Sequence, residues 1–115
     1  MKFIIAIIQP GRLEAVKQAL STVEVVRLTV VECQGFGRGD TRGLADSPPD
    51  MPRRMTRKVQ LQIAVNDSFV DPTVEAITAS SRSGANGEPG DGKIFVLPMD
   101  DCIRIRTGER GEEAI

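Results

Sequence analysis

Residues 59–65 read Val-Gln-Leu-Gln-Ile-Ala-Val, so an apolar side chain at every second position alternates with a polar or small one. Successive side chains of a strand point to opposite faces, and this period of two therefore predicts a strand with one buried face. A sheet with one apolar face needs a second layer. The elements around this strand indicate what supplies that layer.

The residues after this strand predict a helix, a loop and two more extended segments. Apolar positions recur at helical spacing over residues 70–77, and Pro72 fits the first turn, where N–H groups have no intrahelical partner. Glycines are dense in residues 84–92, which indicates a loop. Residues 94–97 predict a short buried strand, and residues 103–106 predict a short final extended segment.

Residues 2–34, which precede the strand predicted at 59–65, predict a strand, a helix and a second strand. Residues 2–9 are apolar and β-branched and end at Pro10-Gly11, as is typical of a buried strand. Residues 13–20 present one apolar helical face. Residues 23–34 are rich in Val, Leu and Thr, which predicts a long strand with a bend near Arg27.

The resulting order is β-α-β-β-α-β, which predicts one α+β domain over residues 1–115 with the ferredoxin-like, split βαβ arrangement. Two helices cover only one face of the four-stranded sheet. The strand predicted at 23–34 nevertheless has apolar side chains on both faces: Val25, Val26, Leu28, Val30 and Val31. We therefore expect a partner subunit to cover the second face, and so an oligomer.

The composition excludes several classes of protein. The formal net charge is −1, and the aromatic residues are four Phe with no Trp or Tyr, which argues against a nucleic-acid partner. Without histidine, no His-based metal site or Ser-His or Cys-His nucleophile can form.

Cys33 and Cys102 are expected as buried thiols without a disulfide, in a reducing compartment. The apolar run 3–8 is too short for membrane insertion, and Gln9-Pro10 is no cleavage site, so we expect a cytoplasmic protein.

The connection from Gly35 to Arg57 is much longer than the two to five residues of an ordinary hairpin. It is rich in Gly and Pro and has almost no apolar periodicity. From Arg38 to Lys58 it carries six basic and three acidic residues, and this local charge of +3 is concentrated at its two ends. Two interpretations stay open: an insertion without a function, or a contact loop whose conformation reports a bound ligand.

Two glycine-rich segments resemble phosphate-binding motifs without matching them. Residues 87–93 fit the pattern G-x-x-x-x-G-K, but Ile94 stands where a P-loop needs Ser or Thr, and a strand follows instead of a helix. Residues 35–40 end a strand but open no helix. Successive glycine N–H groups can still turn toward one anion. Together with Lys93 and with arginines 104 and 106 on one face of an extended segment, they favour a polyphosphate ligand.

Three segments give the chain its resemblance to the nitrogen regulatory protein P-II family, namely Gly35-Phe36-Gly37-Arg38, Gly90-Asp91-Gly92-Lys93-Ile94-Phe95-Val96 and Arg104-Ile105-Arg106-Thr107-Gly108-Glu109. The resemblance implies a ferredoxin-like homotrimer with ATP or ADP in each cleft between subunits. It makes residues 37–57 the family's T-loop, which docks on targets such as ammonium channels or metabolic enzymes. Residues 83–93 become a phosphate loop, and residues 104–109 a C-terminal loop.

The resemblance also implies the nucleotide contacts, which are Ile7, Thr29, Gly35, Phe36, Gly37, Arg38, Lys58, Ala64, Gly90, Asp91, Gly92, Lys93, Arg104 and Arg106. Ile7, Thr29 and Ala64 would border the adenine, and residues 90–93 would wrap the phosphates. Arginines 104 and 106 would reach in from the neighbouring subunit. Lys58 matches the family's lysine that supports 2-oxoglutarate.

The chain departs from the family pattern in the long loop. Gly39 replaces a glutamine that helps hold Mg²⁺ and 2-oxoglutarate, so both ligands are in question. Met51 stands in place of the tyrosine that is uridylylated in many members, which excludes that modification. Ser47 is a weak modification candidate and reads better as a turn residue. The loop 83–89 is about three residues longer than usual in the family.

The expected function is that of an adenine-nucleotide-binding signal-transduction regulator of nitrogen metabolism, which controls target proteins through its T-loop. The alternative is a P-II-like sensor linked to carbon or bicarbonate metabolism, which responds to ADP or AMP and does not bind 2-oxoglutarate. An enzyme is disfavoured because neither cysteine has a histidine partner. We expect no catalytic residue and no resident metal site.

Overall fold

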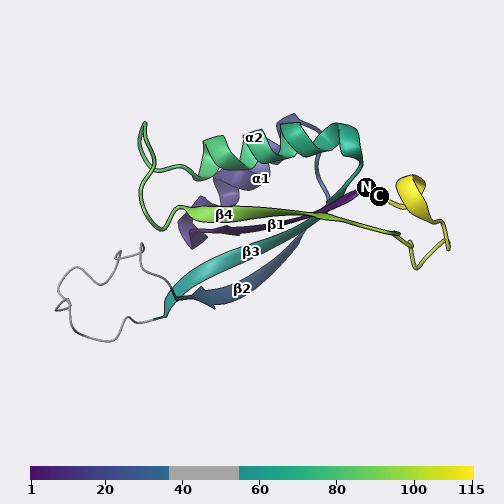
Figure 1. Ribbon diagram of the computed structural model, residues 1–115, viewed down its shortest axis with the longest axis horizontal. Coiled ribbons are helices and arrows are strands. Elements are labelled where there is room, and N and C mark those ends of the chain that lie inside the picture. Colours follow the sequence, from purple (N-terminus) through teal and green to yellow (C-terminus); the bar gives the residue numbers. More distant parts are fainter. Residues whose placement is uncertain (37–54) are drawn as a thin grey trace.

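The computed structural model describes residues 1–36 and 55–115 and confirms the predicted order of elements (Figure 1). The helices and strands are β1 (Lys2–Ile8), α1 (Leu13–Thr22), β2 (Thr29–Gly35), β3 (Thr56–Val65), α2 (Val70–Ser81) and β4 (Gly92–Pro98). Short 3-10 turns at Pro10–Arg12 and Asp67–Phe69 lead into the two helices. This is the expected α+β, ferredoxin-like fold.

The four strands form one antiparallel sheet in the order β2-β3-β1-β4. At the centre, Ile4 of β1 lies opposite Ile63 of β3 on one side and Val96 of β4 on the other. Both helices lie over the same face of this sheet (Figure 1). Neither helix in the described part of the chain has the length and apolarity needed to cross a membrane.

The core lies between the helices and one face of the sheet. Leu61 and Ile63, from the alternating segment 59–65, are fully buried there with Ile4 of β1. Helix α1 contributes Leu20 and helix α2 contributes Ile77. The period of two in β3 thus buries one face as predicted.

The second face of the sheet carries the alternate residues of each strand. No helix covers it in the described part of the chain, and Phe95 and Leu97 are 45% and 40% exposed. Val30 and Val31, neighbours on edge strand β2, are also exposed, at 41% and 39%. Apolar side chains exposed on both faces of an edge strand are consistent with a partner subunit.

The predicted strand over residues 23–34 is wrong in its first half, because β2 begins only at Thr29. The helix α1 ends at Thr22, and the N–H of Val25 still donates to Leu20 O. Glu24 adopts a left-handed φ of +65°, which turns the chain out of the helix. The β propensity of the valines is overruled by this helix-ending turn.

The predicted extended segment at residues 103–106 is also wrong. Ile103 makes an isolated bridge with Arg110, and the chain turns over between them. The N–H of Gly108 donates to Arg104 O at 2.7 Å, and Gly108 has a φ of +75°. Arginines 104 and 106 therefore lie in a tight turn and are not aligned by strand alternation.

Candidate functional site

The glycine-rich loop ends where β4 comes against β1. Gly92 has a φ of +125°, and a Cβ at this position would lie 1.9 Å from Ile7 O. A side chain is therefore excluded both by backbone conformation and by space. Gly90, with a φ of +91°, also needs the left-handed region. These two glycines let the loop pass directly over the end of β1.

Asp91 organises the loop from inside. Its carboxylate accepts hydrogen bonds from the Ser83 N–H at 2.9 Å, the Ser83 hydroxyl at 2.6 Å and the Glu88 N–H at 2.9 Å. The Asp91 N–H in turn donates to Glu88 O at 3.2 Å. The carboxylate thus holds the two sides of the loop together, which supports its interpretation as a turn residue rather than a catalytic acid.

Two side chains converge on the carbonyl of Gly90. Lys58 Nζ donates to Gly90 O at 2.9 Å, and Gln9 Nε2 donates to the same oxygen at 2.6 Å. Lys58 is 7% exposed, and a Cβ at Gly35 would lie 3.3 Å from its Cγ. The predicted site residues Gly35, Lys58 and Gly90 therefore meet at one end of the sheet. Sequence reasoning missed Gln9, whose only signal was its place directly after β1.

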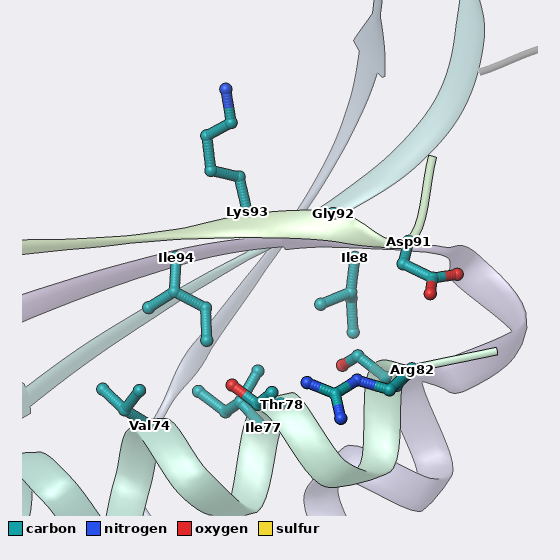
Figure 2. Close-up of a pocket in the computed structure, with 10 residues that line it drawn as sticks. Ile8, Val74, Ile77, Thr78, Arg82, Asp91, Gly92, Lys93 and Ile94 are labelled. Carbon is teal, nitrogen blue, oxygen red and sulfur yellow. The ribbon is translucent and has the colours of Figure 1, made fainter. Parts of the chain in front are cut away.

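Ile7 and Lys93 lie at the same end, on the helix-free face. They are direct cross-strand partners in the β1–β4 ladder. Figure 2 shows Lys93 pointing away from α2, whereas its neighbour Ile94 points toward Val74 of that helix. Phe36 follows β2 at this end and is 66% exposed. The predicted residues Gly37 and Arg38, and also Gly39 and Met51, lie outside the described residues.

The helix side of β4 borders an apolar cavity. A cavity of about 360 Å³ lies between α2 and β4, with apolar walls from Ile8, Val74, Ile77 and Ile94. The side chain of Arg82 lies at the same cavity (Figure 2). The cavity borders the glycine loop but is separated by β4 from the face that carries Lys93.

The remaining predicted contacts lie toward the opposite end of the sheet. Ile7 pairs with Gln60, whereas Ala64, four residues further along β3, pairs with Phe3. At about 3.3 Å per residue, this places Ala64 about 13 Å along the strand from the position beside Ile7. One chain therefore does not bring Ile7 and Ala64 around the same adenine ring.

Arg104 belongs to the same distant group as Ala64. Together with Arg27 and Phe69, these residues line a cavity of about 350 Å³. In Figure 1 the C-terminal loop and the glycine-rich loop lie at opposite ends of the long axis. Thr29, at the start of β2, is the cross-strand partner of Gln62, between the two ends. The structure therefore divides the predicted contacts into a glycine-loop group and a C-terminal group.

The C-terminal loop is closed by Asp101. Its carboxylate accepts hydrogen bonds from Arg110 Nε at 2.9 Å and from the N–H groups of Cys102 and Gly111 at 2.8 and 3.1 Å. The hydrogen bond from Arg110, followed by that from Cys102, lowers the pKa of Asp101 below its ordinary value of 3.8.

Cys102 and Cys33 are free thiols and only half-buried. Within the described residues, no cluster of His, Cys, Asp and Glu could hold a metal ion.

Comparisons with known proteins agree with this architecture. The family model described as nitrogen regulatory protein P-II matches residues 1–109. The chain is 45% identical over 115 residues to nitrogen regulatory protein GlnK1 of Methanosarcina mazei, covering all of this chain and 97% of that protein. It is 42% identical over 120 residues to nitrogen regulatory protein P-II of Rhizobium etli, and 44% identical over 120 residues to that of Cereibacter sphaeroides; both matches cover each chain completely. The chain therefore belongs to the nitrogen regulatory protein P-II family, whose members are signal-transduction regulators of nitrogen metabolism and not enzymes.

Proposed function

We propose that this regulator binds ATP or ADP in clefts between the subunits of a homotrimer, and that the bound nucleotide sets the state of its T-loop. The observation that carries the proposal is the division of the expected contacts into two groups toward opposite ends of one chain. A ligand that needs both groups must bridge two chains.

The glycine-loop group suits the phosphates. Glycine N–H groups that turn toward one point form an anion-binding concavity, and Lys93 adds a positive charge on the face away from α2. Lys58 brings a second ammonium group, which Gly90 O holds at the base of the loop. Cationic donors of this kind bind phosphate oxygens strongly in partly dry sites.

The C-terminal group suits the rest of the nucleotide from the neighbouring chain. Ala64 of this group, together with Thr29 between the two ends, offers a small side chain that an adenine ring can approach. Arg104 and Arg106 would complete the phosphate site. Among residues 1–36 and 55–115, the Arg106 side chain has no hydrogen bond or ion pair, so its guanidinium is free to meet a ligand.

The T-loop, taken as residues 37–57, would be coupled to the site through its base. Gly35 pairs with Thr56, and Thr56 Oγ1 donates to Gly35 O at 3.2 Å. Lys58 lies two residues further on and contacts Gly90 O. A nucleotide at the glycine loop would therefore touch the strand ends from which the T-loop leaves. We propose that the loop presents this state to a target protein, an ammonium channel or a metabolic enzyme.

Isothermal titration calorimetry of the purified protein with ATP and ADP tests the proposal. We expect saturable binding of each nucleotide, and no binding at millimolar concentration would refute the proposal.

The second ligand is open because Gly39 has no side chain to coordinate Mg²⁺. Titrating 2-oxoglutarate or bicarbonate against the ATP-Mg²⁺ and ADP forms identifies it. A response to bicarbonate alone would favour the carbon-sensing alternative. Sustained ATP turnover at about 1 s⁻¹ or faster would contradict a purely regulatory role.

A further inference from the structure

The C-terminal loop is a small hairpin that its backbone already holds together. The N–H of Gly111 donates to Cys102 O at 2.9 Å, and the N–H of Arg104 donates to Glu109 O at the same distance. Between these rungs, Ile103 bridges to Arg110. These two backbone hydrogen bonds, which flank the Ile103–Arg110 pair, do not depend on the side chains of Arg104 or Glu109.

Within this hairpin, the guanidinium of Arg104 is held in one direction. Nη1 donates to Glu109 Oε1 at 3.4 Å, and Nη2 donates to the backbone oxygen of Glu113 at 3.2 Å. The side chains of Arg104 and Glu109 are 28% and 39% exposed, so one side of the pair remains open to solvent. Arg106, two residues further on, has no such partner in the described part of the chain.

We propose that Glu109 is a positioning residue, which orients Arg104 for an anionic group bound at the neighbouring subunit. This inference rests on the proposed function. A guanidinium has five N–H groups, and the contacts with Glu109 and Glu113 use only two of them. The others remain for phosphate oxygens. Because Arg104 is oriented before the ligand arrives, binding loses less side-chain freedom than it would with a mobile arginine.

A purely stabilising role fits the pair less well. A half-exposed ion pair contributes little to folding because solvent screens it, and the backbone rungs hold the hairpin without it. The carboxylate also places a negative charge near the expected phosphates, which by itself would weaken binding. Positioning of Arg104 is the role that offsets this repulsion.

The test is a double-mutant cycle on ADP affinity, measured by calorimetry with Glu109→Ala, Arg104→Ala and the double variant. We expect Glu109→Ala to weaken binding by about two- to twelvefold, the range for freeing one long side chain. In the Arg104→Ala background, the same substitution should change affinity by less than its single effect. An equal effect in both backgrounds would show that Glu109 does not act through Arg104.

Two variants control for charge and folding. Glu109→Gln keeps a side-chain oxygen that can accept from Arg104 and should restore affinity close to that of the wild type. Glu112→Ala removes a nearby exposed carboxylate without touching Arg104 and should not weaken binding. Unchanged or tighter binding by Glu109→Ala, while Arg104→Ala weakens it, would overturn this inference alone. Absence of binding by the wild type would instead overturn the proposed function.

A measurement without ligand covers the case in which Glu109→Ala does not fold. Nitrogen-15 spectra of the wild-type guanidinium groups, assigned through Arg104→Lys, report whether Nη rotation is hindered. We expect hindered rotation for Arg104 and free rotation for Arg106 in the ligand-free protein. Free rotation of both would contradict the positioning role.

Discussion

Gly92 is the residue at which a single added methyl group would collide most directly with the backbone. Its Cβ would overlap Ile7 O, and its φ of +125° is one that other residues rarely adopt. No rotamer change can relieve a clash with a backbone carbonyl oxygen of β1, a strand that is paired on both sides. The position therefore fixes how closely the glycine-rich loop approaches β1.

The Gly92→Ala variant is expected to lose about 4 kcal/mol or more of unfolding free energy, in the range of severe backbone strain. Urea unfolding followed by circular dichroism measures it. The matched control is Gly11→Ala, because a Cβ at Gly11 would meet nothing within 4 Å. Equal stability of the two variants would show that the loop can move away from Ile7 at little cost.

The ionised carboxylate of Asp101 makes the stability of the C-terminal loop depend on pH. Its pKa is lowered in the folded chain, mainly by the hydrogen bond from Arg110, so its contribution to stability is present above about pH 4 and is lost as the pH falls through the lowered pKa. We expect Asp101→Asn to lower the melting temperature at pH 7. The difference from the wild type should shrink below pH 3.8. A difference that stays constant down to pH 2 would rule out a contribution from this ionisation.

At the scale of elements, the ladder between β2 and β3 is complete before the long connection, the proposed T-loop, begins. The ladder runs from Thr29–Gln62 to Gly35–Thr56, so the last two residues expected in the T-loop, Thr56 and Arg57, belong to β3. The two strands are thus paired with each other up to the residues from which the long connection leaves.

Replacing residues 39–54 with a short Gly-Asn turn is therefore expected to preserve the fold. Stability should rise by about 1 kcal/mol, because a shorter loop costs less entropy to close. Chemical denaturation measures the stability, and calorimetry shows whether ADP still binds. A variant with the same sixteen positions in scrambled order keeps the loop length and should match the wild-type stability. Loss of folding in the short variant would show that the loop interior packs against the domain.

The elements with strong periodicity could be predicted from the sequence, and those fixed by local hydrogen bonds could not. The alternation in 59–65 places β3 correctly because burial on one face follows directly from it. Residues 23–28 and 103–106 are equally rich in β-forming residues, but a helix-ending turn at Glu24 and a tight turn after Arg104 determine their paths. Strand propensity does not reveal such turns: at Glu24 the turning residue is not glycine, and Gly108 lies beyond the β-forming residues 103–106.

At the scale of the whole molecule, the family resemblance predicts the residues of the candidate site and assigns arginines 104 and 106 to the neighbouring subunit, but it does not separate Ile7 from Ala64. The family resemblance supplied Ile7, Ala64 and Lys93 together, whereas the β1–β3 register shows that Ile7 and Ala64 are apart in one chain. Register follows from long-range pairing, which a single sequence does not display. The separation of the two groups in one chain predicts how trimers that mix two variants should bind ADP.

Lys93→Ala and Arg106→Ala should each weaken nucleotide binding while leaving the trimer intact. If each site takes Lys93 from one chain and Arg106 from the next, every trimer that mixes the two variants contains one interface with both residues intact. Co-expressed chains with two different tags, purified as mixed trimers, should therefore recover about one ADP per trimer by calorimetry. No recovery would place both residues in the same chain's site.

Under the proposed function, the placement of the two groups toward opposite ends of each chain also links ligand binding to assembly. A nucleotide that bridges neighbouring chains binds the closed ring and not the separated subunit, so it shifts the association equilibrium toward the ring by mass action. Diluting the protein until subunits separate would then weaken the apparent affinity for ADP, and adding ADP would lower the protein concentration at which the ring dissociates. The adenylate pool would thus help to determine how many regulators exist in assembled form.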